Sequence, residues 1–237
     1  MALRKALFIT AANRPLMFKD ILNSWRKVRG FYDWRVVIRL EPTGHEAEHL
    51  EAIAELEHPD LRVIVNKTVL GVLHHPWVGF NELFAQGFDF VIRAEDDLLV
   101  SDDILEYFDW AADTYSKDRE IGSILAFSRT EGRDEAVFRT EGFNSWVWGT
   151  WHTRWDEFMR DTWDHDYSTF NLYPGNESGW DWNLHTRIYP ERGLKSIQPY
   201  QSRVQNVGIW GVHGTAENHV TAFSFNPHYG PLSYEER

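Results

Sequence analysis

Short apolar runs alternate with amphipathic stretches along the first 127 residues of this 237-residue chain. The runs predicted as strands cover residues 6–10, 34–40, 61–66, 88–94 and 121–127. Helical spacing of apolar residues predicts helices over residues 15–30, 46–57, 77–86 and 101–115. Continuous Val, Ile and Phe runs are typical of parallel strands that are buried on both faces. The sequence therefore predicts an α/β, doubly wound fold with a mostly parallel sheet flanked by helices.

The second half of the chain follows no regular pattern and holds most of the 12 tryptophans. Aromatic residues make up 15% of the whole chain, a share that excludes a disordered protein. No linker or low-complexity tract separates the halves. We therefore expect a single domain over residues 1–237, with residues 1–127 as one half and residues 128–237 as the other.

Charge and composition exclude several classes of protein. The chain carries 24 Lys and Arg against 36 Asp and Glu, and a net charge of −12 disfavours a protein that coats nucleic acid. It has no cysteine, which excludes disulfides and thiolate zinc sites. No apolar run reaches the ~18 residues of a membrane span, and the apolar part of the N-terminus is too short for a signal sequence. We expect a soluble, cytoplasmic protein.

Three consecutive carboxylates, Glu95, Asp96 and Asp97, directly follow a predicted buried strand. Ligands of open α/β sheets bind beyond the carboxyl ends of the strands, so a site is expected here. Adjacent carboxylates repel one another unless a cation stabilises them, and Mn²⁺ or Mg²⁺ prefers such oxygen ligands. The alternative is an acidic loop before the next helix, for which Ser101 is the predicted N-cap.

The loop after the first strand contains Asn13 and Arg14 but neither a G-x-G-x-x-G nor a Walker lysine motif. Binding of a dinucleotide or of ATP in a P-loop is therefore disfavoured. A mononucleotide held by Asn13 and Arg14 remains compatible with the sequence. Alternatively, Asn13 caps the helix that begins at Pro15.

Residues 90–108, FVIRAEDDLLVSDDILEYF, resemble the acidic metal motif and following helix of the GT-A glycosyltransferases. The likeness is greatest to the β-1,2-N-acetylglucosaminyltransferase I type. Five further segments resemble that family in the same order, namely residues 13–14, 44–46, 74–77, 143–157 and 179–182. The resemblance implies a GT-A fold, a nucleotide-sugar-binding half over residues 1–127 and an acceptor-binding half over residues 128–237. The short, cysteine-free chain suggests a bacterial or viral relative.

The resemblance also assigns roles to individual residues. Asp97 matches the metal ligand, Asp181 the catalytic base, and His213 a candidate second metal ligand, with His219 a weaker one. The residues that match or replace contacts to the nucleotide-sugar are Asn13, Arg14, Glu41, His74, Glu95 and Asp96. Glu41 is included because Pro42 occupies the position of the family's uracil-binding Asp, and the neighbouring Glu41 is the candidate to replace that Asp.

These residues suit an inverting displacement. A cation on Asp97 would neutralise the leaving diphosphate of a UDP-sugar, and Asp181 would take the proton of the attacking hydroxyl. Asp181 could instead be a helix-start residue, and His213 a surface or core histidine. Sugar rings stack on indoles, so an acceptor or sugar platform is expected among Trp146, Trp148, Trp180 and Trp182, for which core packing is the alternative.

The acceptor remains open. The resemblance implies a hydroxyl on a glycan or protein. A hydroxymethylated base of viral DNA is the alternative, for which a basic strip is conceivable from Arg129, Arg133, Arg139, Arg154 and Arg160. A non-catalytic carbohydrate- or nucleotide-binding module is a third possibility. A nucleotidyltransferase is disfavoured because residues 10–14 contain no glycine. The sequence gives no indication of the oligomeric state.

Overall fold

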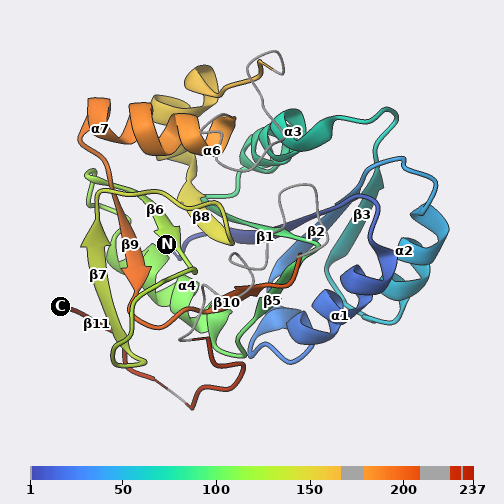
Figure 1. The fold of residues 1–237 in the computed structure, drawn as a ribbon, viewed down its shortest axis with the longest axis horizontal. Helices are drawn as coiled ribbons and strands as arrows, with labels where there is room; N and C mark the ends of the chain where they lie inside the picture. The colour runs from blue at the N-terminus through green and yellow to red at the C-terminus, as the bar shows by residue number, and fades with distance from the viewer. Residues whose placement is uncertain (1, 167–178, 209–224, 231) are drawn as a thin grey trace.

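The computed structural model describes residues 2–166, 179–208, 225–230 and 232–237. Within these residues, nine strands form one sheet in the order β11-β7-β9-β6-β8-β4-β1-β2-β3 (Figure 1). Its strands are β1 Lys5–Ala11, β2 Arg35–Leu40, β3 Leu61–Val65, β4 Phe90–Glu95, β6 Ile121–Leu125, β7 Ala136–Thr140, β8 Trp148–Trp151, β9 Lys195–Pro199 and β11 Glu235–Glu236. A two-stranded ribbon pairs β5 Leu98–Val100 with β10 Val204–Asn206. The main helices are α1 Pro15–Trp25, α2 Glu46–Ala54, α3 Gly71–Ala85, α4 Ile104–Thr114, α6 Trp180–Asn183, η4 Leu184–Ile188 and α7 Tyr189–Arg192.

The strands of the first half confirm the predicted parallel sheet. β1 lies between β2 and β4 and pairs parallel with both, and β3 pairs parallel with β2. Opposite Thr10 in this register stands Glu95, so the turn after β1 and the acidic triplet meet at the same edge. β8 breaks the pattern, because it lies antiparallel between β4 and β6.

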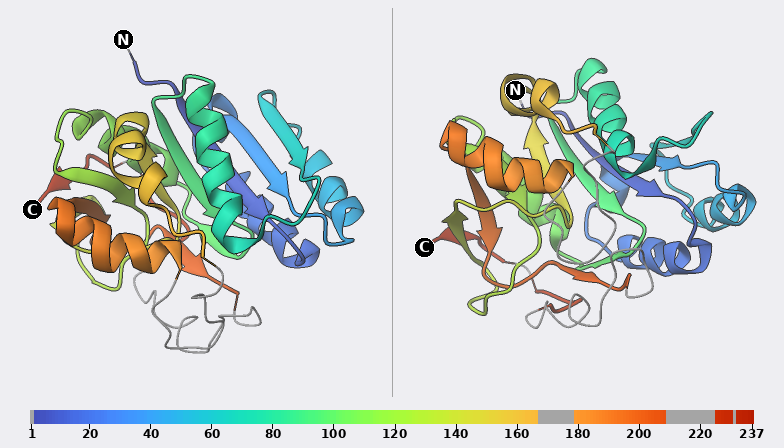
Figure 2. Two further views of the ribbon diagram at one scale, coloured as in Figure 1. Left: turned by 90° about the horizontal axis from the view of Figure 1, so that it is seen from above. Right: turned by 45° about the horizontal axis from the view of Figure 1, so that its top comes forward.

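Helices cover both faces of the sheet (Figures 1 and 2). α1, α2 and α4 pack on one face, and α3 with the continuous helical stretch α6–η4–α7 packs on the other. Alternation along β4 sends Phe90, Ile92 and Ala94 to the first core and Val91 to the second. Arg93 therefore faces the second core.

The predicted start of α1 at Pro15 is confirmed, whereas two other predicted helix starts and two predicted caps were wrong. α3 begins at Gly71, six residues before the predicted residue 77, and continues through Pro76. α4 begins at Ile104, and Ser101 is not its cap, because the Ser101 hydroxyl donates to Asp103 Oδ1 at 2.6 Å. Asn13 does not cap α1 either. Arg14 occupies the N-cap position, without a side-chain hydrogen bond.

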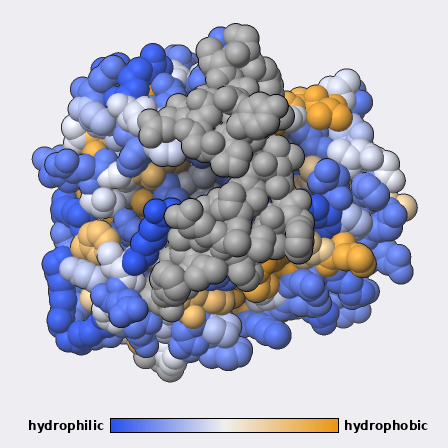
Figure 3. All heavy atoms as spheres, in the orientation of Figure 1, coloured by the Kyte–Doolittle hydropathy of each residue, from blue (hydrophilic) through white to orange (hydrophobic). Residues whose placement is uncertain are grey.

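The described surface is mostly hydrophilic on the face in Figure 3, where apolar residues form only small separate patches. The most exposed large apolar side chains are Leu16, at 83%, and Val69, at 63%. Among the described residues, no helix has both the length and the apolar character needed to cross a membrane.

Candidate functional site

Arg14 and two carboxylates of the triplet come together at the carboxyl edge of β1 and β4. The Arg14 guanidinium pairs with Asp96 Oδ1 and, at 2.9 Å, with Asp97 Oδ2. The backbone N–H of Ala12 donates to Asp96 Oδ2 at 3.1 Å. The turn after β1 therefore holds the acidic triplet, as the strand-end argument predicted.

Asp97 has the features of a cation ligand. It is 8% exposed, and among the described residues its Oδ1 has no hydrogen-bond partner. Burial raises the pKa of Asp97 to about 7, and the negative charge of Glu95 adds to this effect. A divalent ion bound at Oδ1 would relieve both penalties, so the donor set fits Mn²⁺ or Mg²⁺ with further ligands from a diphosphate or water.

Gly208 lies directly over the Asp97 carboxylate. A Cβ at this position would collide with Asp97 Oδ2. The neighbouring amide of Val207 donates to the Asp97 carbonyl at 2.9 Å. The segment after β10 thus approaches the candidate metal ligand closely, which the absence of a side chain at Gly208 permits.

Glu95 is held from inside the sheet by Arg93. Arg93 Nη1 lies 2.5 Å from Glu95 Oε1, and the Arg93 guanidinium carbon lies 5.1 Å from the ring centre of Trp180. Arg93 is 3% exposed. Glu95 is thus bonded to a buried cation that also contacts the first residue of α6.

Asp181 stands in the first turn of α6, as expected for a helix-start residue. This position does not conflict with a role as the catalytic base, which stays a prediction. Gly179 precedes the helix with φ 102°, a conformation that favours glycine. The amide of Trp182 donates to Asp181 Oδ1 at 3.0 Å, and the Ser145 hydroxyl is 3.3 Å from Oδ2. Burial raises the pKa of Asp181, and the charge of Glu95 raises it further.

Glu41 directly follows β2 at the carboxyl edge of the sheet, and its contact with the nucleotide stays a prediction. Its side chain is 4% exposed and accepts hydrogen bonds from Asn66 Nδ2 and from the amides of Leu70 and Gly71, at 2.7 to 3.1 Å. These contacts hold the N-terminus of α3. A role in reading the nucleotide base would compete with them for the same oxygens.

The histidine candidates have mixed outcomes. His74 lies on α3 and stacks on His165, with ring centres 4.7 Å apart. His213 and His219 lie outside the described residues. Among the residues that are described, no group of three His, Asp or Glu side chains could hold a metal ion by itself.

Two of the four candidate tryptophans are core residues. Trp148 is fully buried, and Trp180, at 3% exposure, is stacked between Trp148 and Trp163. Neither has a ring face open to a sugar, which corrects the prediction for these two. Trp146 is partly buried against Phe127, and Trp182 is 36% exposed. Local sequence does not distinguish these cases, because burial depends on packing against distant strands.

Four of the five arginines considered for a DNA-binding strip have polar partners within the fold. Arg133, Arg139 and Arg160 each pair with acidic side chains. Arg154 is 3% exposed and donates to the backbone carbonyls of residues 115, 116, 118 and 121. Three of the five charges are therefore paired with carboxylates, and the DNA acceptor stays a prediction.

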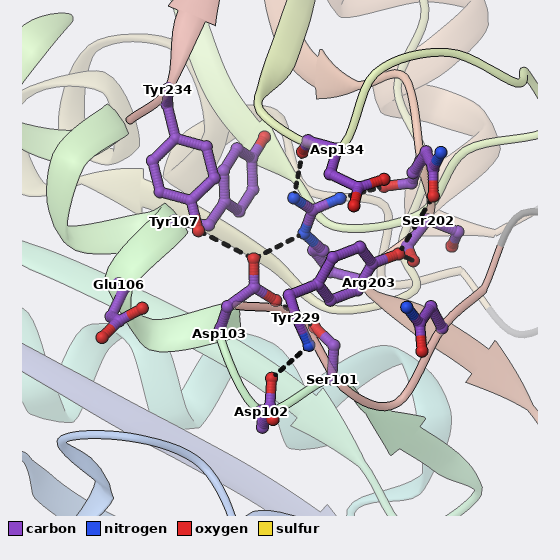
Figure 4. A network of polar contacts seen from close by, with 12 residues as sticks. Ser101, Asp102, Asp103, Glu106, Tyr107, Asp134, Ser202, Arg203, Tyr229 and Tyr234 are labelled. Carbon is purple, nitrogen blue, oxygen red and sulfur yellow. Dashed lines mark hydrogen bonds and ion pairs between the residues drawn. The ribbon is translucent and has the colours of Figure 1, made fainter. Parts of the chain in front are cut away.

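A buried polar network anchors the β5–β10 ribbon (Figure 4). The fully buried ion pair between Arg203 and Asp103 measures 2.9 Å. Tyr234 donates to the same Asp103 oxygen at 2.7 Å, and the Tyr229 ring lies 4.1 Å from the Arg203 guanidinium. This network lies at one end of the ribbon, and Asp97 and Gly208 lie at its other end.

Sequence reasoning missed four contributors to the site, namely Arg93, Ser145, Arg203 and Gly208. Only Arg93 left a local signal, a single charge within the otherwise apolar strand FVIRA. The other three act through contacts with residues between 36 and 111 positions away.

Solved structures share this architecture. The mannosyltransferase PcManGT from Pyrobaculum calidifontis, in complex with GDP-Man and Mn²⁺, has a TM-score of 0.56 and 15% identity, over 84% of this chain and 55% of its own. TarS from S. aureus has a TM-score of 0.57 and 12% identity, over 85% of this chain and 59% of its own. GalNAc-T7, with UDP, GalNAc and Mn²⁺, has a TM-score of 0.57 and 12% identity, over 86% of this chain and 43% of its own. The fold is GT-A.

The GT-A likeness concerns the fold alone, and the chain spans little more than half the length of the first two structures. The narrower resemblance to the N-acetylglucosaminyltransferase I type stays a prediction. Comparison of the sequence with protein-family models and with curated proteins finds no match.

Proposed function

We propose that this chain is a metal-dependent, inverting glycosyltransferase that moves a sugar from a UDP-sugar to a hydroxyl of a glycan or protein. One observation carries the proposal. Arg14, Asp96 and Asp97 meet at the carboxyl edge of the sheet, and Arg93 bonds to Glu95 while its guanidinium lies over Trp180, the residue before Asp181. The Mn²⁺ and nucleotide-sugar or nucleotide in two structures of the same fold support it.

On the donor side, Asp97 would hold Mn²⁺ or Mg²⁺ through its unpaired Oδ1. The bound ion would neutralise the diphosphate leaving group. Arg14 keeps Asp96 and Asp97 in place and brings a positive charge to the same edge. The predicted nucleotide contacts of Asn13 and His74 belong to this half of the proposal, residues 1–127.

On the acceptor side, residues 128–237 would supply the base and the sugar platform. A raised pKa makes the Asp181 carboxylate a stronger proton acceptor, and the Ser145 hydroxyl helps to orient it. Attack from the side opposite the leaving group would invert the anomeric carbon. Trp146 and Trp182 are the candidate stacking residues, because their rings are not fully buried.

The deciding experiment combines donor binding with turnover. A panel of nucleotide sugars is incubated with Mn²⁺, and release of the nucleoside diphosphate is followed with and without EDTA. We expect Asp97→Ala to abolish metal-dependent donor binding. We expect Asp181→Asn to bind the donor within about threefold of wild type while kcat falls by about 10² to 10⁴.

Asp109→Asn is the matched control, because this carboxylate lies on α4 and pairs with Lys5 at the surface. Equal loss of donor binding in the Asp97 and Asp181 variants would contradict the assigned roles. Binding without turnover by the wild-type protein would favour the non-catalytic module instead. Transfer to hydroxymethylated DNA alone would select the viral-DNA acceptor.

A further inference from the structure

Arg93 is a buried charge in a place that would suit an apolar residue. It is 3% exposed in the centre of β4, between Ile92 and Ala94, which are fully buried. Its strand neighbours in register are Phe8 on β1 and Trp148 on β8. Removing a guanidinium from water is costly, so a cation in this setting calls for an explanation other than packing.

The contacts of Arg93 are few. Nη1 bonds to Glu95 at 2.5 Å, and the guanidinium lies over the Trp180 ring at 5.1 Å. Within the part of the chain that the structure describes, Nε has no hydrogen-bond partner. The Glu95 side chain is 28% exposed, so water already solvates its charge. The ion pair therefore adds little to the solvation of the Glu95 charge, and its main effect is to fix the position of the Glu95 side chain.

The two partners of Arg93 belong to the two sides of the candidate site. Glu95 ends β4 and directly precedes Asp96 and Asp97. Trp180 begins α6 and directly precedes Asp181. The Trp180 ring is itself fixed by stacking on Trp163, with ring centres 4.5 Å apart and planes inclined by 10°. Arg93 thus connects the end of β4 to the start of α6.

We infer that Arg93 is a positioning residue for the transfer reaction, which holds Glu95 and the start of α6 so that Asp97 and Asp181 face the same donor sugar. This inference rests on the proposed function. A planar guanidinium can stack on an indole and bond a carboxylate in a fixed direction, whereas a lysine ammonium is a flexible point charge. The geometry therefore favours arginine over lysine at this position.

The test compares Arg93→Met, Arg93→Lys and Arg154→Met. Methionine fills a similar volume without charge. Arg154 is the matched control, because it is also 3% exposed and lies over a tryptophan, Trp151, at 4.6 Å, but bonds to backbone carbonyls away from the carboxylates. Each variant is assayed for kcat, for binding of UDP with Mn²⁺ by calorimetry, and for hydrogen–deuterium exchange of the α6–η4 amides.

For Arg93→Met we expect kcat to fall by about 100-fold, because small displacements of reacting groups cost this much. UDP binding stays within about threefold, since Arg14 and Asp97 are unchanged. Exchange of the α6–η4 amides becomes faster. Arg93→Lys recovers about tenfold in kcat over Arg93→Met, and Arg154→Met changes neither kcat nor α6–η4 exchange by more than about threefold.

Two results would overturn the inference. One is an Arg93→Met protein whose kcat and α6–η4 exchange match those of Arg154→Met. The other is a parallel loss of kcat and UDP binding, which would mean that Arg93 acts on the nucleotide site instead. A wild-type protein without turnover would defeat the proposed function, while faster α6–η4 exchange in Arg93→Met alone would still establish the connection that Arg93 makes.

Discussion

Gly208 shows how a residue without a side chain can determine the geometry of a charged site. The backbone passes so close to Asp97 that any Cβ would collide with the carboxylate oxygen that Arg14 also contacts. The oxygen cannot retreat freely, because Asp97 is buried between the strand end and this segment. Access to the second oxygen of Asp97 therefore depends on the path of the chain at Gly208.

We expect Gly208→Ala to lower kcat/KM by about 10² and to weaken Mn²⁺ binding, because the displaced carboxylate no longer presents Oδ1 correctly. Steady-state kinetics and a metal titration measure both effects. Gly230→Ala is the control, since a Cβ there would meet nothing within 4 Å. Similar kinetics for the two alanine variants would show that the close approach has no bearing on the site.

The positions of candidate residues could be predicted where they follow from strand ends, and their contacts could not where these depend on distant partners. Asp96, Asp97 and Arg14 were placed correctly because β1 and β4 are local patterns and parallel strands end at one edge. Glu41 has the same strand-end position, yet its oxygens are occupied by amides about 30 residues away. Nothing near Glu41 in the sequence indicates these donors.

At the scale of elements, a buried histidine lies near the start of α3. His75 Nδ1 lies 3.4 Å from Glu41 Oε1, beneath the first turn of the helix. Burial lowers the pKa of His75 to about 4, the charges of Arg39 and Arg93 lower it too, and Glu41 opposes them. The predicted start at residue 77 was too late, because α3 already begins at Gly71 and continues through Pro76.

The His75 pKa predicts how stability depends on pH. The unfolded chain takes up a proton on His75 below about pH 6.5, and the folded chain only near pH 4, so acid favours unfolding between these values. We expect the free energy of unfolding to fall by up to about 1.4 kcal/mol per pH unit across this window from His75 alone. Urea unfolding at several pH values measures the slope.

His75→Gln removes this contribution, so its slope between pH 4 and 6.5 should be shallower than that of wild type. His228→Gln serves as the comparison, because this side chain is 71% exposed. The carboxylates of the chain titrate in all three proteins and cancel in the differences. Identical slopes for all three proteins would rule out His75 as the acid-sensitive group.

At the scale of the whole molecule, the Arg203–Asp103 pair joins segments that are far apart in the chain. Asp103 precedes α4, Arg203 precedes β10, and Tyr229 and Tyr234 come from the C-terminal residues (Figure 4). Arg203 also donates to the carbonyl of Asp134. Three regions separated by about 100 and 30 residues are thus fixed to one another by a single buried cation.

Removing one partner of this pair should be costly. We expect Arg203→Met to lower the free energy of unfolding by about 3 to 5 kcal/mol, since Asp103 would remain as a buried charge. Lys195→Met, which breaks the exposed pair with Glu120, should cost less than about 1 kcal/mol. Denaturant midpoints compare the two, and an Arg203 variant as stable as the Lys195 variant would contradict a structural role for the pair.

Topology at this scale divides into a part that local pattern predicts and a part that it does not. The parallel strands β1 to β4 follow from repeated strand–helix units. β8 lies between β4 and β6 in antiparallel orientation, and β9 pairs with β6 although Lys195 lies 74 residues after its partner Ile121. Such pairings are decided by long-range contacts, so the second half could be recognised only by its tryptophans.

Those tryptophans give the molecule an optical property. Trp148, Trp180 and Trp163 form a stack in which the Trp180 ring is nearly parallel to Trp163 and 6.0 Å from Trp148. Indoles this close share their electronic excitation, so the stack is a chiral exciton-coupled chromophore. Because Trp180 begins the helix that carries Asp181, we expect a displacement of that helix to change the near-ultraviolet circular dichroism.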